Sequence, residues 1–139
     1  MRRAWIRIAL ATMLAAASLL AMAASSRWMS KVPQKERERV NPYAKQSGAI
    51  AAGKLLFEDH CAKCHGADAL GRHGRPSLRS EEIRAATDGQ LAWLLKNGSL
   101  RKGMPSWSVL PEPERWQIIS YLRSLPKEPR SSTATTESR

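Results

Sequence analysis

Two cysteines and a histidine lie within one short segment, Cys61-Ala62-Lys63-Cys64-His65. Thiols and imidazoles bind metals and metal cofactors, and the C-x-x-C-H spacing is typical of covalent haem attachment. In such a site the two thiols add to the vinyl groups on one edge of a porphyrin, and the next side chain turns beneath the iron. The motif therefore predicts one haem c, attached through Cys61 and Cys64, with His65 as an iron ligand.

Three other uses of a paired-cysteine motif compete with haem attachment. A redox disulfide of the thioredoxin type needs a β-α-β context, and a zinc ribbon needs a second pair of cysteines. A structural disulfide would not require His65. The chain has only two cysteines, and its central part lacks the alternation of apolar and polar residues that is typical of β-strands. These features favour haem attachment.

An iron bound by one histidine needs a second axial ligand. The candidates beyond residue 24 are Met104, His60, His73 and Met29. Met104 is favoured because its thioether is soft and uncharged, Gly103 permits a close backbone approach, and Pro105 stiffens the loop. His73, in a polar loop, is the main alternative. His60 lies in the turn that delivers the cysteines, where an exposed helix-end histidine is the simpler interpretation.

Apolar periodicity and capping residues predict an all-α domain of three or four short helices. The first helix covers residues 48–60, and the last covers residues 112–125 and ends at a proline. Between them, Ser80 caps a short turn and Thr87 opens a helix that Gly98 ends. Helices this short need tertiary packing, and a large buried cofactor would supply it.

The chain divides into four parts. Residues 1–24 begin with basic side chains and continue as an apolar run, which indicates an export signal peptide or an N-terminal membrane anchor. Residues 25–47 are polar and basic and have little to bury, so they are predicted to form a linker. Residues 48–126 form the predicted domain. Residues 127–139 are predicted to be a disordered tail.

The formal charge of +11 lies mainly outside the predicted domain. Residues 25–47 carry six basic and two acidic side chains, whereas residues 48–126 carry 11 basic and 8 acidic ones. The domain is therefore nearly balanced. A basic linker on an exported chain is expected to be a solvated or membrane-surface tether, and no nucleic-acid partner is expected.

Residues 48–126 resemble class I c-type cytochromes, and the small bacterial single-haem branch is most similar. The matching features are Gly53, Phe57, the Cys61–His65 motif, the Gly74-Arg75-Pro76-Ser77-Leu78 loop, Gly103-Met104-Pro105 and Tyr121-Leu122. The resemblance implies the cytochrome c fold, with the first and last helices crossing near Gly53 and Tyr121. It also implies that the carbonyl of Pro76 bonds His65 and that Met104 is the distal iron ligand.

These expectations define a function. With His65 and Met104 both bound, the iron has no open position, which indicates a periplasmic single-electron carrier that is not an enzyme and exchanges electrons with redox partner proteins. It would be soluble if residues 1–24 are cleaved, and otherwise anchored to the inner membrane facing the periplasm. One alternative is a haem c subunit at the electron entry or exit point of a larger membrane or periplasmic oxidoreductase. Another is a gas-binding or peroxide-reacting haem site in which Met104 is not bound to iron.

Overall fold

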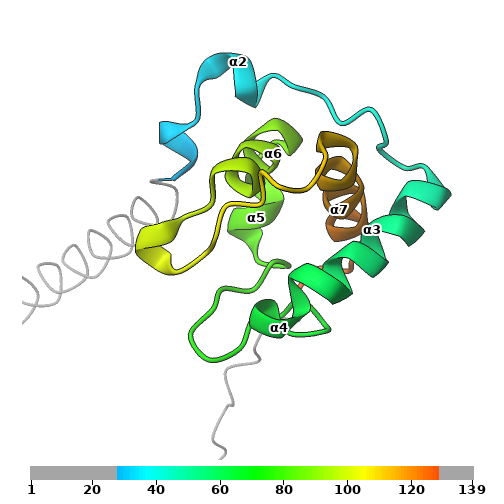
Figure 1. Ribbon diagram of the computed structural model, residues 1–139, viewed down its shortest axis with the longest axis vertical. Helices are drawn as coiled ribbons and strands as arrows, with labels where there is room; N and C mark the ends of the chain where they lie inside the picture. Colours follow the sequence, from blue (N-terminus) through cyan, green and yellow to red (C-terminus); the bar gives the residue numbers. More distant parts are fainter. Residues whose placement is uncertain (1–27, 129–139) are drawn as a thin grey trace, which may run out of the picture.

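The described part of the chain folds as short helices joined by loops (Figure 1). The computed structural model describes residues 28–128. Its helices, in chain order, are η1 (Met29–Lys31), α2 (Gln34–Arg37), α3 (Ser47–His60), α4 (Ala62–His65), α5 (Glu81–Ala85), α6 (Asp88–Asn97), η2 (Leu100–Lys102) and α7 (Glu112–Ser124). Within this range the only extended pairing is an isolated bridge between Ser99 and Met104. The all-α prediction is confirmed.

Helices α3 and α7 make the most extensive helix–helix contact of the described chain. They meet where Gly53 lets the two backbones approach, because a Cβ at this position would lie 2.0 Å from the carbonyl oxygen of Gln117. Four residues further along each helix, Phe57 packs on Tyr121 with ring centroids 5.3 Å apart. Phe57 is completely buried. The predicted crossing of the first and last helices is confirmed, and it fixes the end of α3, from which the cysteine motif continues.

The middle of the chain forms the opposite side of the core. The Thr87 hydroxyl accepts a hydrogen bond from the Gln90 amide at 3.1 Å, and the Gln90 side chain accepts one from the Thr87 amide at 2.8 Å. This capping box begins α6, and Gly98, with a φ of +69°, ends it. Leu91 and Leu95 of this helix are buried in one cluster with Ile118 and neighbouring residues of α7. The caps predicted at Thr87 and Gly98 are confirmed.

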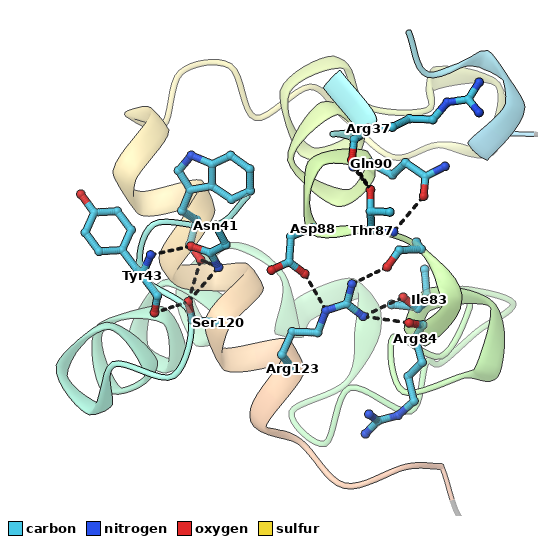
Figure 2. A network of polar contacts seen from close by, with 12 residues as sticks. Arg37, Asn41, Tyr43, Ile83, Arg84, Thr87, Asp88, Gln90, Ser120 and Arg123 are labelled. Carbon is cyan, nitrogen blue, oxygen red and sulfur yellow. Dashed lines mark hydrogen bonds and ion pairs between the residues drawn. The ribbon is translucent and has the colours of Figure 1, made fainter. Parts of the chain in front are cut away.

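A single guanidinium joins three helices (Figure 2). Arg123 of α7 pairs with Asp88 of α6 at 2.8 Å. It also donates to the carbonyl oxygens of Ile83 at 3.1 Å and Arg84 at 3.2 Å, and to that of Ala86. The last carbonyls of a helix lack partners within the helix. Arg123 therefore satisfies the end of α5 and holds it beside α6 and α7.

The prediction that residues 25–47 form a linker is wrong over residues 28–46, here called the N-terminal strap. The strap contains η1 and α2, and α2 packs against α6. Val32 is only 1% exposed. The second half of the strap is bound through Asn41, whose Nδ2 donates to the Trp116 carbonyl at 3.2 Å and to the Ser120 hydroxyl at 3.0 Å (Figure 2). A few buried residues and backbone groups suffice to dock a segment that is polar on average.

The predictions for the two ends fall largely outside the described residues. The signal or anchor at residues 1–24 lies wholly outside them, as do residues 129–139 of the predicted tail. Lys127 and Glu128 are described and are held by Arg79, whose guanidinium donates to the Lys127 carbonyl at 3.1 Å. Between residues 28 and 128, no helix is both long and apolar enough to cross a membrane.

Candidate functional site

A large, mainly apolar cavity lies between the two halves of the helical core. The space inside it that no atom fills, including the part open to solvent, is about 1300 Å³. Cys61, Cys64, His65 and Met104 all line this cavity. The structure thus brings together the four site residues singled out in the sequence, although Met104 is far from the other three along the chain.

The cysteine pair is presented at the junction of α3 and α4. Cys61 continues from α3, with its amide donating to the Phe57 carbonyl at 2.8 Å, and Cys64 lies within α4. Cys61 is buried and Cys64 is exposed, and both thiols are free. Burial raises the pKa of the Cys61 thiol to about 11, with a smaller contribution from Cys64. Redox-active cysteines have lowered pKa values instead, so the environment of Cys61 does not fit a thioredoxin-type dithiol.

His65 is buried and oriented by one hydrogen bond. Its Nδ1 lies 3.0 Å from the carbonyl oxygen of Pro76. A carbonyl oxygen only accepts, so Nδ1 carries the proton, and in the neutral ring Nε2 then has the lone pair that a metal would need. The loop that carries Pro76 is tightly folded. Gly71 has a φ of +83°, and a Cβ there would lie 2.3 Å from the carbonyl oxygen of Arg75. The expected Pro76–His65 bond is present.

Met104 is positioned by backbone pairing beyond the end of α6. The Ser99 amide donates to the Met104 carbonyl at 2.8 Å, and the Met104 amide donates back to Ser99 at 3.1 Å. Gly98 lets the two arms of this turn meet, since a Cβ at Gly98 would lie 2.6 Å from the carbonyl carbon of Pro105. Gly103 takes the left-handed conformation at a φ of +72°. Two glycines and one proline thus shape the turn that carries the thioether.

The loops that carry Pro76 and Met104 are tied to each other by a hydrogen bond between two residues that line the cavity. The Arg75 guanidinium, from the loop that carries Pro76, donates to the carbonyl of Lys102 at 2.7 Å. The carbonyl of Lys102 precedes Gly103 and Met104. One surface arginine therefore links the segment that orients His65 to the segment that carries Met104.

The other potential ligands are placed differently. His73 is exposed in a loop, with a φ of +49°, and does not line the cavity. Met29 lies in η1 and also does not line it. His60 does line the cavity, where its ring packs against Trp107 at a centroid distance of 5.2 Å.

Two wall residues were not anticipated from the sequence. Trp28 and Glu82 both line the cavity, and the Trp28 indole Nε1 donates to the Glu82 carboxylate at 2.8 Å. Trp28 was missed because the surrounding segment is polar on average. Its own large apolar side chain, with those of Met29 and Val32 close behind, was a local signal that this segment packs.

The residues of the cavity fit a covalently attached haem. The cavity offers two free thiols on one side, an imidazole with an available Nε2, and a thioether on a separate loop. The rest of the lining is mainly aliphatic and aromatic, including Leu78, Leu91, Leu94 and Leu95. Apolar walls with a few placed polar groups are typical of cofactor sites.

Comparison with known proteins gives the same picture. Residues 48–122 match the family described as cytochrome C oxidase, cbb3-type, subunit III. The chain is 34% identical to cytochrome c550 of Pseudomonas aeruginosa over 60% of this chain and 61% of that protein. It is 31% identical to the cbb3-type cytochrome c oxidase subunit CcoP of Rubrivivax gelatinosus over 66% of this chain and 31% of that protein. The chain therefore spans less than two thirds of the former and about a third of the latter.

Solved structures share the fold. Cytochrome cL of Methylophaga aminisulfidivorans aligns with a TM-score of 0.55 and 29% identity, over 61% of this chain and 58% of that one. Cytochrome cL of Hyphomicrobium denitrificans aligns with a TM-score of 0.55 over 73% of this chain and 67% of that one, at 20% identity. With the family match over residues 48–122, these likenesses show that the chain belongs to the cbb3-type subunit III family of class I c-type cytochrome domains, whose cofactor is a covalent haem c.

Proposed function

We propose that this chain is a periplasmic single-electron carrier with one haem c. Cys61 and Cys64 form the thioether links, and His65 and Met104 are the two iron ligands. The observation that carries the proposal is that these four side chains, from α4, its junction with α3, and the loop after η2, line one apolar cavity. Haem supplies reversible one-electron chemistry when it is bound.

The surroundings of the ligands support electron transfer over substrate chemistry. The hydrogen bond from His65 Nδ1 to Pro76 fixes the imidazole tautomer and leaves Nε2 for the iron. The bridge between Ser99 and Met104 holds the thioether on its loop. If His65 and Met104 both hold the iron, the haem would offer no position to a substrate, so the chain would act as a carrier and not as an enzyme. A methionine ligand raises the reduction potential, which suits delivery of electrons towards a terminal acceptor.

The full chain, produced in a host that attaches haem c, tests this function directly. Intact mass under denaturing conditions should show one added haem and should report whether residues 1–24 are removed. The reduced protein should not bind carbon monoxide at neutral pH, because His65 and Met104 would both hold the iron. Carbon monoxide binding at neutral pH would contradict the carrier function and would favour a gas-binding or peroxide-reacting site.

A second candidate function is a haem c subunit or domain at the electron entry or exit point of a larger oxidoreductase. It is supported by the family description and by relatives that are named subunits of cbb3-type oxidases, of which this chain covers about a third. Purification from the native host separates the two functions: a carrier is recovered alone, whereas a subunit is recovered with other polypeptides. Fractionation of the same cells shows whether the chain is a soluble periplasmic protein or is anchored to the inner membrane through its N-terminus.

A further inference from the structure

The N-terminal strap reaches the haem cavity through its first residue. Trp28 is half-buried, lines the cavity, and donates its indole N–H to Glu82, which lines the same wall. Trp28 also packs against the large buried cluster of α5, α6 and α7. The family match begins at residue 48. This part of the cavity wall therefore comes from a segment that lies outside the matched domain.

The strap is held on the domain by specific hydrogen bonds and by a buried side chain. The Gln90 side chain donates to the Met29 carbonyl at 3.3 Å, next to Trp28 in the chain. The Arg37 guanidinium donates to the Val32 carbonyl at 2.8 Å and so braces the turn between η1 and α2. Val32 is almost fully buried. These contacts fix the backbone on the C-terminal side of Trp28.

Gly89 of α6 is a point of close approach between the strap and the domain. A Cβ at Gly89 would lie 2.0 Å from the Glu36 carbonyl oxygen and 3.0 Å from those of Arg37 and Arg39. The hydroxyl of Thr87, two residues before Gly89, donates to the Arg37 carbonyl at 2.8 Å (Figure 2). All these oxygens belong to backbone, so a methyl group at Gly89 forces the strap away. Gly89 does not itself line the cavity.

From these contacts we infer that Trp28 is a positioning residue of the haem site. Trp28 is held by its hydrogen bond to Glu82 and by the close packing of the strap backbone against Gly89. Its side chain closes one wall of the cavity and so excludes water and small ligands from the iron. The inference rests on the proposed function. Oxidised haem iron carries one more positive charge than reduced iron, and a dry, apolar surrounding disfavours the added charge. Closure by Trp28 therefore raises the midpoint potential as well as limiting access.

The central experiment is a titration of the oxidised full chain with imidazole, a small ligand that competes for the iron. Trp28→Ala should lower the imidazole dissociation constant about tenfold, which corresponds to about 1.4 kcal/mol of binding free energy. The same change should lower the midpoint potential. Val40→Ala is the matched control, since Val40 is in the same strap but is 82% exposed and does not line the cavity. If Trp28→Ala and Val40→Ala both titrate like the unchanged chain, the role of Trp28 is wrong.

A substitution outside the cavity tests whether the position of the strap backbone controls how well Trp28 closes the cavity. Gly89→Ala should increase imidazole affinity and lower the midpoint potential in the same direction as Trp28→Ala, because it displaces the strap by its backbone. Gly48→Ala is the control, because a Cβ at Gly48 meets no atom within 4 Å. Equal imidazole affinity in the Gly89→Ala and Gly48→Ala proteins would contradict the claim that packing of the strap on Gly89 holds Trp28 in place.

The hydrogen bond to Trp28 is tested at Glu82. Glu82→Gln keeps an oxygen that accepts from the indole and should retain the imidazole affinity of the unchanged chain, whereas Glu82→Ala should increase it. Equal affinity in the two variants would overturn the role of this bond. If Trp28→Ala does not retain haem, Trp28→Phe, which keeps an aromatic ring, should show a smaller change in the same direction.

Haem content separates the two levels of inference. Absorbance per protein mass is measured for every variant before titration. If the unchanged chain carries no haem, the proposed function and the role of the strap both fail. If it carries haem and none of the strap variants alters imidazole affinity or potential, only the role of the strap fails.

Discussion

Gly53 of α3 and Gln117 of α7 meet backbone to backbone: a Cβ on Gly53 would lie 2.0 Å from the Gln117 carbonyl oxygen. This approach sets where the two helices cross, and Phe57 and Tyr121 pack together one turn beyond it. The end of α3 is thereby fixed against α7, and Cys61 follows at that end. The position of the haem-attachment motif depends on a glycine two turns upstream.

Gly53→Ala is expected to destabilise the fold. The added methyl group cannot fit at 2.0 Å from a backbone oxygen, so α3 and α7 must separate, at a cost of about 1–3 kcal/mol, the usual range for overpacking. Urea denaturation measures the change in the free energy of unfolding. Gly48→Ala, in the first turn of the same helix and without neighbours within 4 Å, should cost nothing or stabilise slightly. Equal stability of the two variants would contradict the close crossing.

Replacement of Met104 tests the distal ligand. Met104→Leu keeps the volume of the side chain but removes the sulfur, so the thioether-to-iron charge-transfer band of the oxidised protein should disappear completely and the midpoint potential should fall. Absorption spectroscopy and a redox titration report the two effects. Met29→Leu, at a methionine that does not line the cavity, should keep the band. An unchanged spectrum in Met104→Leu would remove Met104 from the iron.

Cys61 is expected to be needed for stable haem attachment. Cys61→Ala leaves one thioether at most, so the yield of covalently bound haem should fall well below that of the unchanged chain. Intact mass after denaturation distinguishes covalent from merely associated haem. Lys63→Ala, an exposed position inside the motif, should keep the full yield. A normal covalent yield from Cys61→Ala would contradict the thioether at this residue.

An ion pair between the N-terminal strap and α7 predicts a dependence of stability on pH. A hydrogen bond from Arg39 is the main reason that the pKa of Glu112 lies below its usual 4.5, and it outweighs the opposite effect of partial burial. The carboxylate therefore stabilises the folded chain above pH 4.5, and this contribution is lost as the pH falls through the lower folded-state pKa. Both side chains are partly exposed, so the pair is expected to contribute at most about 1 kcal/mol.

Glu112→Gln measures this contribution. At neutral pH the variant should be slightly less stable to urea than the unchanged chain, and the difference should narrow once the pH is below the folded-state pKa of Glu112. Glu114→Gln, which removes the same charge from the same turn of α7, is the control for net charge. A stability gap for Glu112→Gln that is the same at neutral and acidic pH would rule out the ion pair with Arg39 as its source.

Much of the helical framework was accessible from the sequence because its signals are local. Ser80, Thr87 and Gly98 marked the ends of helices, and the proline after Leu125 marked the end of the last one. The C-x-x-C-H motif likewise predicts its cofactor from spacing alone, since both thiols and the imidazole must serve a single porphyrin. The all-α class and the haem c cofactor therefore needed no knowledge of distant contacts.

Tertiary structure decided which distant residues share the cavity. Met104, His73 and His60 were all within reach of the iron along the chain, and only the fold places Met104 on the cavity wall and His73 in an exposed loop. The role of the N-terminal strap was likewise invisible locally: its average polarity predicted a linker, but Trp28 and the backbone carbonyls over Gly89 find partners far away in sequence. Composition describes what a segment contains, whereas docking depends on a few side chains and backbone groups whose complementary surface exists only after the rest of the chain has folded.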